Sequence, residues 1–208
     1  MPPPSAAAVF GPRLAMAVEF ARLLATDGVE RGLLGPQEVP RLWERHLLNC
    51  AVVAEIIAPG ARAIDVGSGA GLPGVALALA RPDLSMVLLE PMARRCAFLV
   101  EVVQRLGMAQ VEVRRGRAED GPRRPGADVA VSRAVAKLDP LVGWCLPLIR
   151  VGGRVLAMKG ATAATELSHA AAVIHSAGGR HCRIRRCGVG VVDPPAIVVE
   201  ILRGSLGH

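Results

Sequence analysis

The sequence predicts an α/β fold with a mostly parallel sheet, helices on both faces and a C-terminal antiparallel hairpin. Strand and helix patterns alternate from residue 61 onward, which is typical of a parallel sheet covered by helices. The last two strand patterns are joined by the short, turn-rich segment GVGVVDPP. A parallel crossover needs about a dozen residues or more, so these two strands are expected to pair antiparallel. With 208 residues, of which 51% are hydrophobic, the chain can bury the core of one such domain.

The N-terminal part predicts a helical extension. Residues 1–12 are rich in Pro and Ala and are expected to be frayed. Residues 13–26 place apolar side chains at the 3, 4, 7 spacing of an amphipathic helix. A second helix is expected over 37–58, with prolines near its start and Pro59-Gly60 at its end. We expect residues 1–60 to pack as an extension on one globular unit formed by residues 61–208.

The remaining elements follow in alternation. Continuous apolar runs predict buried strands, and apolar positions on one face predict the helices between them. The expected strands are 61–66, 85–90, 111–114, 127–132, 153–159, 180–187 and 196–202, and the expected helices are 72–80, 92–106, 137–149 and 161–177. No internal repeat and no long linker divides this part of the sequence.

The charge of the chain favours an anionic partner. The formal net charge is +7, from 25 basic and 18 acidic residues, and nucleic acid is the first candidate. Only Lys137 and Lys159 are lysines, which indicates compositional drift toward arginine, but drift does not explain the excess of positive charge. Aromatic residues make up 2% of the chain, which disfavours a single-strand binder that stacks bases on aromatic platforms.

Other features bear on cellular location. No apolar run reaches the roughly 18–20 residues of a membrane helix, and the first residues do not form a secretory signal. The five cysteines are odd in number and scattered, which favours a reducing cytoplasm over a disulfide framework. Their spacings and those of the histidines do not form a paired zinc-ligand pattern, so no metal is expected. We expect a cytoplasmic protein without membrane contact, and a monomer.

Residues 63–74 read AIDVGSGAGLPG and form a glycine-rich turn between a strand and a helix. Ligands bind at this edge of open α/β sheets, and glycine permits positive φ and close backbone approach. Gly69-x-Gly71-x-x-Gly74 matches a dinucleotide pattern, so an NAD-binding protein is one alternative. Asp65 at the strand end would repel a pyrophosphate and attract a cationic ligand, which favours S-adenosylmethionine. Its binding set would include Asp65, Gly67, Gly69 and Gly71.

Two later segments complete this expected site. Glu90 ends the second strand and lies 23 residues after Gly67, near the spacing of about 20 residues expected for an acid that accepts from ribose hydroxyls. The loop after the third strand, RRGRAED, is expected to line the adenine. Ala118 would offer a backbone N–H there, and Glu119 a side-chain acceptor for the adenine amino group.

Several segments together resemble one family. These are RHLLNC, IDVGSGAGLPGVALALARPD, LLEPMARRCAFL, GRAED, VSRAVAKL and GGRVLAMKG. They resemble the glucose-inhibited division protein B family, the rRNA methyltransferases G that methylate guanine N7 in 16S rRNA. The resemblance implies a Rossmann-like class I S-adenosylmethionine-dependent fold, with cofactor-site positions at Gly67, Leu72, Ala118, Glu119 and Arg133. The chain departs from the family at Asn49-Cys50, where Asp-Ser is common, so no role of that acid is carried over.

Guanine N7 has an in-plane lone pair and no proton, so the reaction requires positioning and no general base. Arg133 is expected to bind the methionine carboxylate or orient the guanine, and Lys159 to contact O6 or a phosphate. Further RNA candidates are Arg45 and His46, if the N-terminal helices cover the site, and Arg183 and Arg185, which share one face of a strand. The 16S rRNA is expected within the 30S subunit or an assembly intermediate. Another RNA, a protein or a small molecule is the alternative substrate.

The basic pair at positions 123–124 is one of several further candidates for phosphate contacts, which supply affinity without reading sequence.

Overall fold

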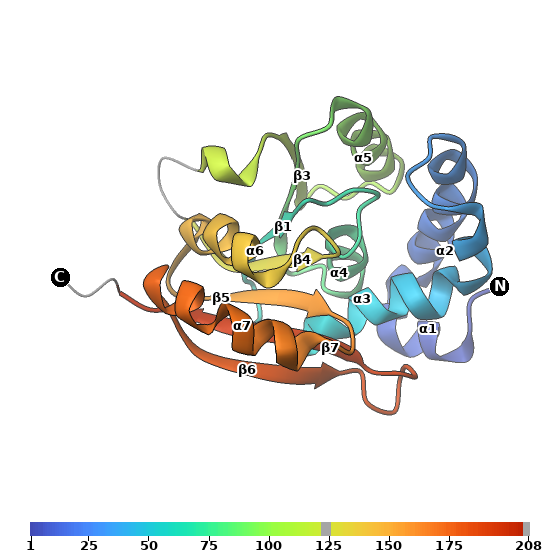
Figure 1. The fold of residues 1–208 in the computed structure, drawn as a ribbon. Coiled ribbons are helices and arrows are strands. Elements are labelled where there is room, and N and C mark those ends of the chain that lie inside the picture. The colour runs from blue at the N-terminus through green and yellow to red at the C-terminus, as the bar shows by residue number, and fades with distance from the viewer. Residues whose placement is uncertain (122–125, 206–208) are drawn as a thin grey trace.

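The computed structural model describes residues 1–121 and 126–205, so the basic pair at positions 123–124 lies outside the described residues. Within them, seven strands form one sheet in the order β3-β2-β1-β4-β5-β7-β6 (Figure 1). The strands are β1 (Arg62–Val66), β2 (Ser85–Glu90), β3 (Val111–Arg115), β4 (Ala127–Arg133), β5 (Ile149–Lys159), β6 (Gly179–Cys187) and β7 (Ala196–Arg203). All pairs are parallel except those of β7, which is antiparallel to β5 and β6. The predicted sheet and C-terminal hairpin are confirmed.

Helices cover both faces of this sheet (Figure 1). They are α4 (Gly74–Ala80), α5 (Ala93–Arg105), α6 (Leu138–Cys145) and α7 (Ala163–Ser176). Apolar residues of α4 and α5 belong to one buried cluster, together with the N-terminal helices. Those of α6 and α7 belong to a second cluster. The chain therefore forms a three-layer structure, and the carboxyl ends of β1, β2, β4 and β5 meet at one edge.

The N-terminal region differs from its prediction in two respects. Residues 4–10 form helix α1 (Pro4–Phe10), with Ala6 and Phe10 buried, so the prediction of a frayed N-terminus is wrong. The ring of Phe10 packs edge-on against Trp43, with 6.3 Å between centroids. This contact with a distant part of the chain stabilises helix α1, and the sequence of residues 1–12 alone does not predict it.

The second N-terminal helix is also less regular than expected. Helix α2 (Leu14–Leu23) lies within the predicted range. The predicted helix over 37–58 is a chain of short helical pieces, namely Pro36–Arg41, Leu42–Leu48, α3 (Asn49–Ala51) and Val52–Ile56. Pro40 lies inside the first piece and lacks the N–H for a backbone hydrogen bond, which interrupts a regular α-helix, and this piece is a tighter 3₁₀ helix. Among the described residues, no helix is long and apolar enough to cross a membrane.

The N-terminal helices pack directly beneath the glycine-rich turn. Phe20 of α2 is fully buried. A Cβ added at Gly71 would lie 3.3 Å from the Phe20 ring and 2.7 Å from Val75 of α4. The extension therefore supports the turn from below and shares its hydrophobic core with the sheet.

Truncation of Phe20 tests this shared core. We expect Phe20→Ala to lower the free energy of unfolding by about 3–5 kcal/mol, because a fully buried aromatic side chain is removed. Val18 on the same helix is 40% exposed, and Val18→Ala should change the free energy by less than about 0.5 kcal/mol. Urea denaturation followed by circular dichroism measures both. Equal effects of the two variants would contradict a core that extends into α2.

Candidate functional site

The glycine-rich turn links β1 to α4. Gly67, Gly69 and Gly71 have φ values of +73°, +55° and +93°, which lie in the left-handed region that favours glycine. A Cβ at Gly67 would also lie 2.6 Å from the Val135 side chain. The turn therefore presents bare backbone toward the loop that follows β4.

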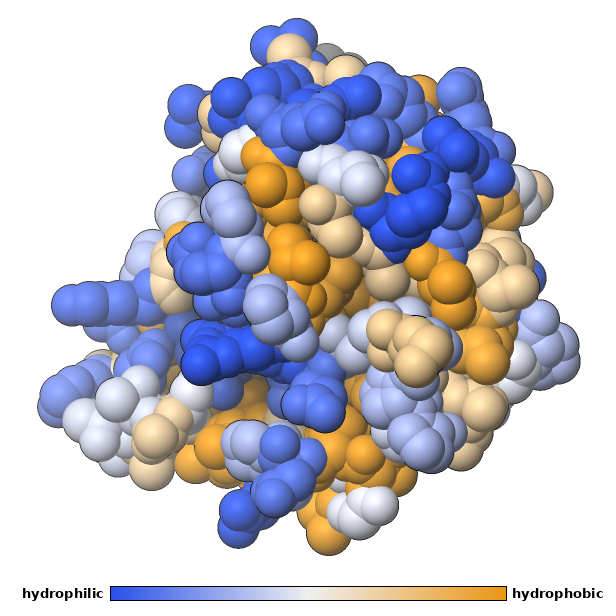
Figure 2. Space-filling model, turned by 90° about the vertical axis from the view of Figure 1, so that its right-hand side faces the viewer, coloured by the Kyte–Doolittle hydropathy of each residue, from blue (hydrophilic) through white to orange (hydrophobic). Residues whose placement is uncertain are grey.

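A cavity of about 640 Å³ opens over this turn. The predicted cofactor residues that line it are Gly67, Gly69, Leu72, Glu90, Ala118, Glu119 and Arg133. Gly71 does not line it; its backbone turns toward Phe20 and Val75. Figure 2 shows the face at the right of Figure 1, where apolar side chains gather in a central hollow between hydrophilic groups.

Asp65 lies behind the turn, and its side chain does not line the cavity. It is fully buried, and its Oδ2 accepts a hydrogen bond from the Gly74 N–H at 2.9 Å. Its Oδ1 is a buried acceptor without a partner among the described residues. Burial raises the pKa of this carboxyl to about 7. The expected carboxylate lies beneath the turn, where it holds the start of α4. It does not line the cavity.

Glu90 is buried in the cavity wall, with 1% of its surface exposed. Its Oε2 accepts from the Gly69 N–H at 2.9 Å, and its Oε1 accepts from the Met92 N–H at 3.0 Å. Arg95 lies 3.8 Å from Oε1. A carboxylate has about four acceptor positions, so two backbone donors orient Glu90 and leave capacity for ligand hydroxyls.

The lining of this cavity contains residues that the sequence analysis missed. Ala118 is buried at the start of a 3₁₀ turn. Trp144 from α6 and Leu34 from the N-terminal region add apolar surface. Trp144 is one of two tryptophans in the chain, and this scarcity was the signal available in the sequence. Trp144 packs against the same buried cluster as Ala118, whereas Leu34 belongs to the other cluster. Apolar side chains from both sides of the sheet therefore line this cavity, as in many ligand sites.

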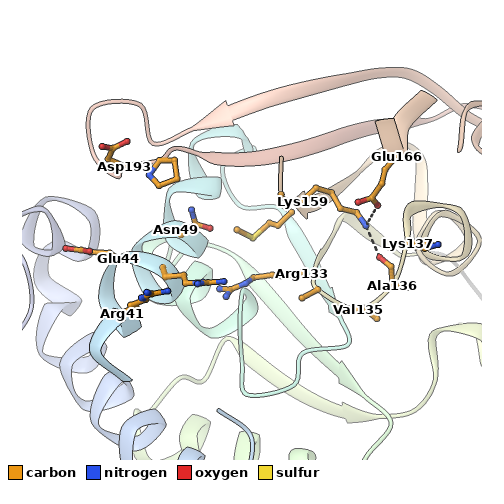
Figure 3. Close-up of a pocket in the computed structure, with 15 residues that line it drawn as sticks. Arg41, Glu44, Asn49, Arg133, Val135, Ala136, Lys137, Lys159, Glu166 and Asp193 are labelled. Atoms are coloured by element: carbon orange, nitrogen blue, oxygen red, sulfur yellow. Dashed lines mark hydrogen bonds and ion pairs between the residues drawn. The ribbon is translucent and has the colours of Figure 1, made fainter. Parts of the chain in front are cut away.

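A second cavity of about 810 Å³ adjoins the first (Figure 3). The residues common to both are Arg133, the last residue of β4, and Ala134 and Val135, which follow it. Of the predicted substrate residues, Arg45 and Lys159 line the second cavity, whereas His46 lines the first. The segment 133–135 is therefore a shared wall between two binding spaces.

Lys159 lies at the end of β5, on the wall of the second cavity. Its Nζ donates to the Ala136 carbonyl at 2.8 Å and forms an ion pair with Glu166 at 2.9 Å (Figure 3). These contacts hold the ammonium group against the loop that carries the shared wall.

Arg133 is held by two uncharged acceptors. Its Nη1 donates to Cys50 Sγ at 2.9 Å, and its Nη2 donates to His46 Nδ1. In the part of the chain that the structure describes, no carboxylate lies within ion-pair distance of this guanidinium. The N-terminal extension thus reaches the site. Arg133 makes no direct ion pair among the described residues, although the buried Asp65 carboxyl lies near enough to interact with its charge.

Arg183 and Arg185 lie elsewhere. They project from edge strand β6 and line neither cavity. Arg183 makes a two-pronged contact with Glu200 at 2.8 and 3.1 Å, and Arg185 lies 3.6 Å from the same carboxylate. Arg154 contacts Glu200 as well, at 3.3 Å. Three arginines around one carboxylate leave a positive patch on this side of the sheet.

The family of the chain follows from comparison with known proteins. Residues 13–192 match the family GidB, described as rRNA small subunit methyltransferase G. The chain belongs to this family. It is 56% identical to the ribosomal RNA small subunit methyltransferase G of Salinispora arenicola, over 97% of this chain and 88% of the relative. It is also 56% identical to that of Mycolicibacterium paratuberculosis, over 99% and 84% of the two chains.

Solved structures support the same fold. Mitomycin 7-O-methyltransferase aligns with a TM-score of 0.61 at 24% identity, over 89% of this chain and 60% of that one. A SAM-dependent O-methyltransferase from Thermotoga maritima aligns with a TM-score of 0.58 at 14% identity, over 77% and 66%. The protein is a class I methyltransferase that uses S-adenosylmethionine, as the sequence predicted, and the NAD-binding alternative is set aside.

The residues of the first cavity fit this cofactor. The left-handed glycines leave room where a Cβ at Gly67 would meet Val135, and the orphaned oxygen of Asp65 lies beneath them. Glu90 has free acceptor capacity, and no carboxylate among the described residues contacts the Arg133 guanidinium directly. Across residues 1–121 and 126–205, no three His, Cys, Asp or Glu side chains gather as a metal-binding group.

Proposed function

We propose that this methyltransferase transfers a methyl group from S-adenosylmethionine to N7 of a guanine in 16S rRNA. The observation that carries the proposal is the pair of adjoining cavities that share the segment 133–135. One cavity has the acid, glycines and apolar side chains that suit the cofactor, and the other is bordered by Arg45 and Lys159. The relatives' names and the net charge of +7 support an RNA substrate.

The chemistry requires little from the protein beyond placement. The bound cofactor supplies an electrophilic methyl group on a sulfonium centre. Guanine N7 attacks with a lone pair and releases no proton, so no side chain has to act as a base. The residues of the two cavities must hold the nucleophile at about 3 Å from the methyl carbon and in line with the leaving sulfur.

The cofactor residues have separate proposed roles. Glu90 accepts from the ribose hydroxyls, the Ala118 N–H and the Glu119 carboxylate contact the adenine edge, and Arg133 binds the carboxylate of the amino-acid part. Gly67, Gly69 and Leu72 form the floor, and Gly71 shapes the turn. Asp65 supplies negative charge beneath the turn, near the cofactor's ammonium group.

The second cavity receives the target base. Lys159 donates to guanine O6 or to a phosphate from its anchored position on the loop wall. Arg45, which is 56% exposed at the side chain, contacts RNA phosphate at the mouth of the cavity. Arg183 and Arg185 contribute a weaker, more distant phosphate contact on β6. We also propose that residues 1–60 and 61–208 act as one unit, monomeric and cytoplasmic.

Methyl transfer to defined substrates tests this function. We expect labelled methyl groups to enter 16S rRNA of undermethylated 30S subunits or assembly intermediates, and nucleoside mass spectrometry to identify 7-methylguanosine. Naked 16S rRNA, assayed in parallel, shows whether assembled protein is required. A label in another base, in ribosomal protein or only in small molecules would overturn the rRNA guanine assignment without affecting cofactor binding.

Arg45 and Arg183 form a matched pair for RNA binding. Arg45→Ala should raise the KM for the RNA substrate about 5-fold to 10-fold, since a phosphate contact at the cavity mouth is lost. Arg183→Ala should raise it by less than about 2-fold, because Arg183 lines neither cavity and its two-pronged contact with Glu200 is closer than the 3.6 Å ion pair of Arg45 with Glu38. The dissociation constant of S-adenosylmethionine should stay unchanged in both. A larger effect of Arg183→Ala than of Arg45→Ala would indicate that the RNA-binding surface lies on β6.

A further inference from the structure

His46 lies between two side chains that determine where its proton resides. A guanidinium has only donors, so the Nδ1 atom that receives the Arg133 hydrogen bond must carry a lone pair. The proton of the neutral ring is therefore on Nε2, which lies 2.7 Å from Glu38 Oε2 and donates to it. Glu38 thus sets the tautomer of His46, and His46 in turn presents an acceptor to Arg133.

The two partners of Arg133 have a common property. His46 Nδ1 and Cys50 Sγ are both uncharged acceptors, and they take two of the five N–H groups. A carboxylate in either place would orient the guanidinium equally well, but it would neutralise its charge. The negative charge of Glu38 is separated from Arg133 by the imidazole of His46. Arg133 is thereby oriented and still free to attract an anion.

We propose that Glu38 and His46 are positioning residues, which hold Arg133 toward the carboxylate of the cofactor's amino-acid part without neutralising it. The proposal rests on the role assigned to Arg133 in the proposed function. It gives the N-terminal extension a part in cofactor binding, because both residues precede β1, His46 contacts Arg133 and Glu38 contacts His46. His46 is then a partner of Arg133 and not an RNA contact.

Burial and charge keep His46 in the required neutral form. The residue is 7% exposed, and burial lowers its pKa. The hydrogen bond that His46 donates to Glu38 opposes this effect, whereas the charges of Arg133 and Arg45 lower the pKa further. Burial also raises the pKa of the Cys50 thiol, so that group stays neutral. A protonated imidazole would direct an Nδ1–H at the N–H groups of Arg133, and the contact would be lost.

Two substitutions of His46 separate positioning from packing. In His46→Asn the amide oxygen can occupy the place of Nδ1 and accept from Arg133. In His46→Gln the terminal amide reaches toward the place of Nε2 and leaves no acceptor for Arg133. Both remove the ring, so a role limited to packing would affect the two variants alike. Arg133→Ala serves as the reference for complete loss of the contact.

Two ligands complete the experiment. S-adenosylhomocysteine carries the carboxylate, and methylthioadenosine lacks the whole amino-acid group. We expect His46→Gln to weaken S-adenosylhomocysteine binding about 10-fold, as one oriented charge-assisted contact is lost. Arg133→Ala should weaken it at least as much, and His46→Asn by less than about 3-fold. Methylthioadenosine should bind all three variants like the unmodified protein. Isothermal titration calorimetry measures each constant.

The outcomes distinguish the inference from the function on which it rests. If Arg133→Ala loses affinity and His46→Gln does not, the positioning role is overturned and the role of Arg133 stands. If Arg133→Ala keeps its affinity for S-adenosylhomocysteine, the role of Arg133 falls, and the inference falls with it. Equal losses for both ligands in both His46 variants would show a packing role and overturn the proposal.

The pH profile of methyl transfer gives an independent readout. In the unmodified protein, kcat/KM for the cofactor should fall further on the acid side of the range in which Asp65 titrates, as protonation of His46 breaks its contact with Arg133. In His46→Asn this acid limb should weaken, because an amide does not titrate. An identical acid limb in both proteins would overturn the assignment of His46.

Discussion

Glu90→Ala is expected to weaken S-adenosylmethionine binding by about 100-fold or more. Hydrogen bonds to a charged acceptor contribute about 1.5–3 kcal/mol each, and two ribose hydroxyls would lose theirs. The variant also releases the N–H groups of Gly69 and Met92, which Glu90 holds at 2.9 and 3.0 Å. The turn would then lose both its ligand contact and its support. Calorimetric titration with the cofactor measures the change.

Glu119→Gln is the matched control for this experiment. Glu119 lines the same cavity, but it is exposed, and a glutamine oxygen can still accept from the adenine amino group. We expect its affinity to change by less than about 3-fold. Thermal melting of both variants shows whether they are folded. A folded Glu90→Ala protein that binds the cofactor with unchanged affinity would refute the cofactor assignment of this cavity.

Strand β2, which ends at Glu90, could be predicted from the sequence, whereas helix α1 at the N-terminus could not. Residues 85–90 form a continuous apolar run that ends in an acid, and β2 has the same bounds. Such a strand is buried on both faces, so its composition alone identifies it. Helix α1 instead depends on distant partners, since Phe10 packs on Trp43, more than 30 residues along the chain. Short Pro/Ala-rich segments carry no periodic signal of such a contact.

The same limit applies to the site. The sequence placed Arg133 at the cofactor edge, because it follows a strand of the parallel sheet. Its partners Cys50 and His46 lie 83 and 87 residues earlier in the chain, and no spacing rule links them. The sequence also did not predict which way the Asp65 side chain points. Its hydrogen-bond donor, the Gly74 N–H, is brought close to it by a turn of left-handed glycines. Strand order predicts which residues approach the site, whereas side-chain packing decides which way they face.

Asp65→Asn is expected to stabilise the ligand-free protein at neutral and higher pH. The pKa of Asp65 is raised by burial from its ordinary value of 3.8 to about 7. Between these values the unfolded chain releases a proton that the folded protein retains, so the free energy of unfolding falls as the pH rises. The loss amounts to up to about 4 kcal/mol, at 1.36 kcal/mol for each pH unit. An asparagine does not titrate, and its oxygen can still accept from the Gly74 N–H.

Urea denaturation at about pH 5 and about pH 8 measures this difference. The stability of Asp65→Asn relative to the unmodified protein should increase between the two. A constant difference would show that Asp65 is already ionised at the lower pH.

Cofactor binding should respond to the same substitution in the opposite direction. The ammonium and sulfonium groups of S-adenosylmethionine favour the ionised carboxylate, so binding should release a proton near pH 7, and affinity should rise with pH through this range. Asp65→Asn should bind more weakly above about pH 7 and show no such rise. Methylthioadenosine carries neither cation, so it should bind both proteins alike at every pH. If its affinity followed that of S-adenosylmethionine, Asp65 would act through the shape of the turn and not through its charge.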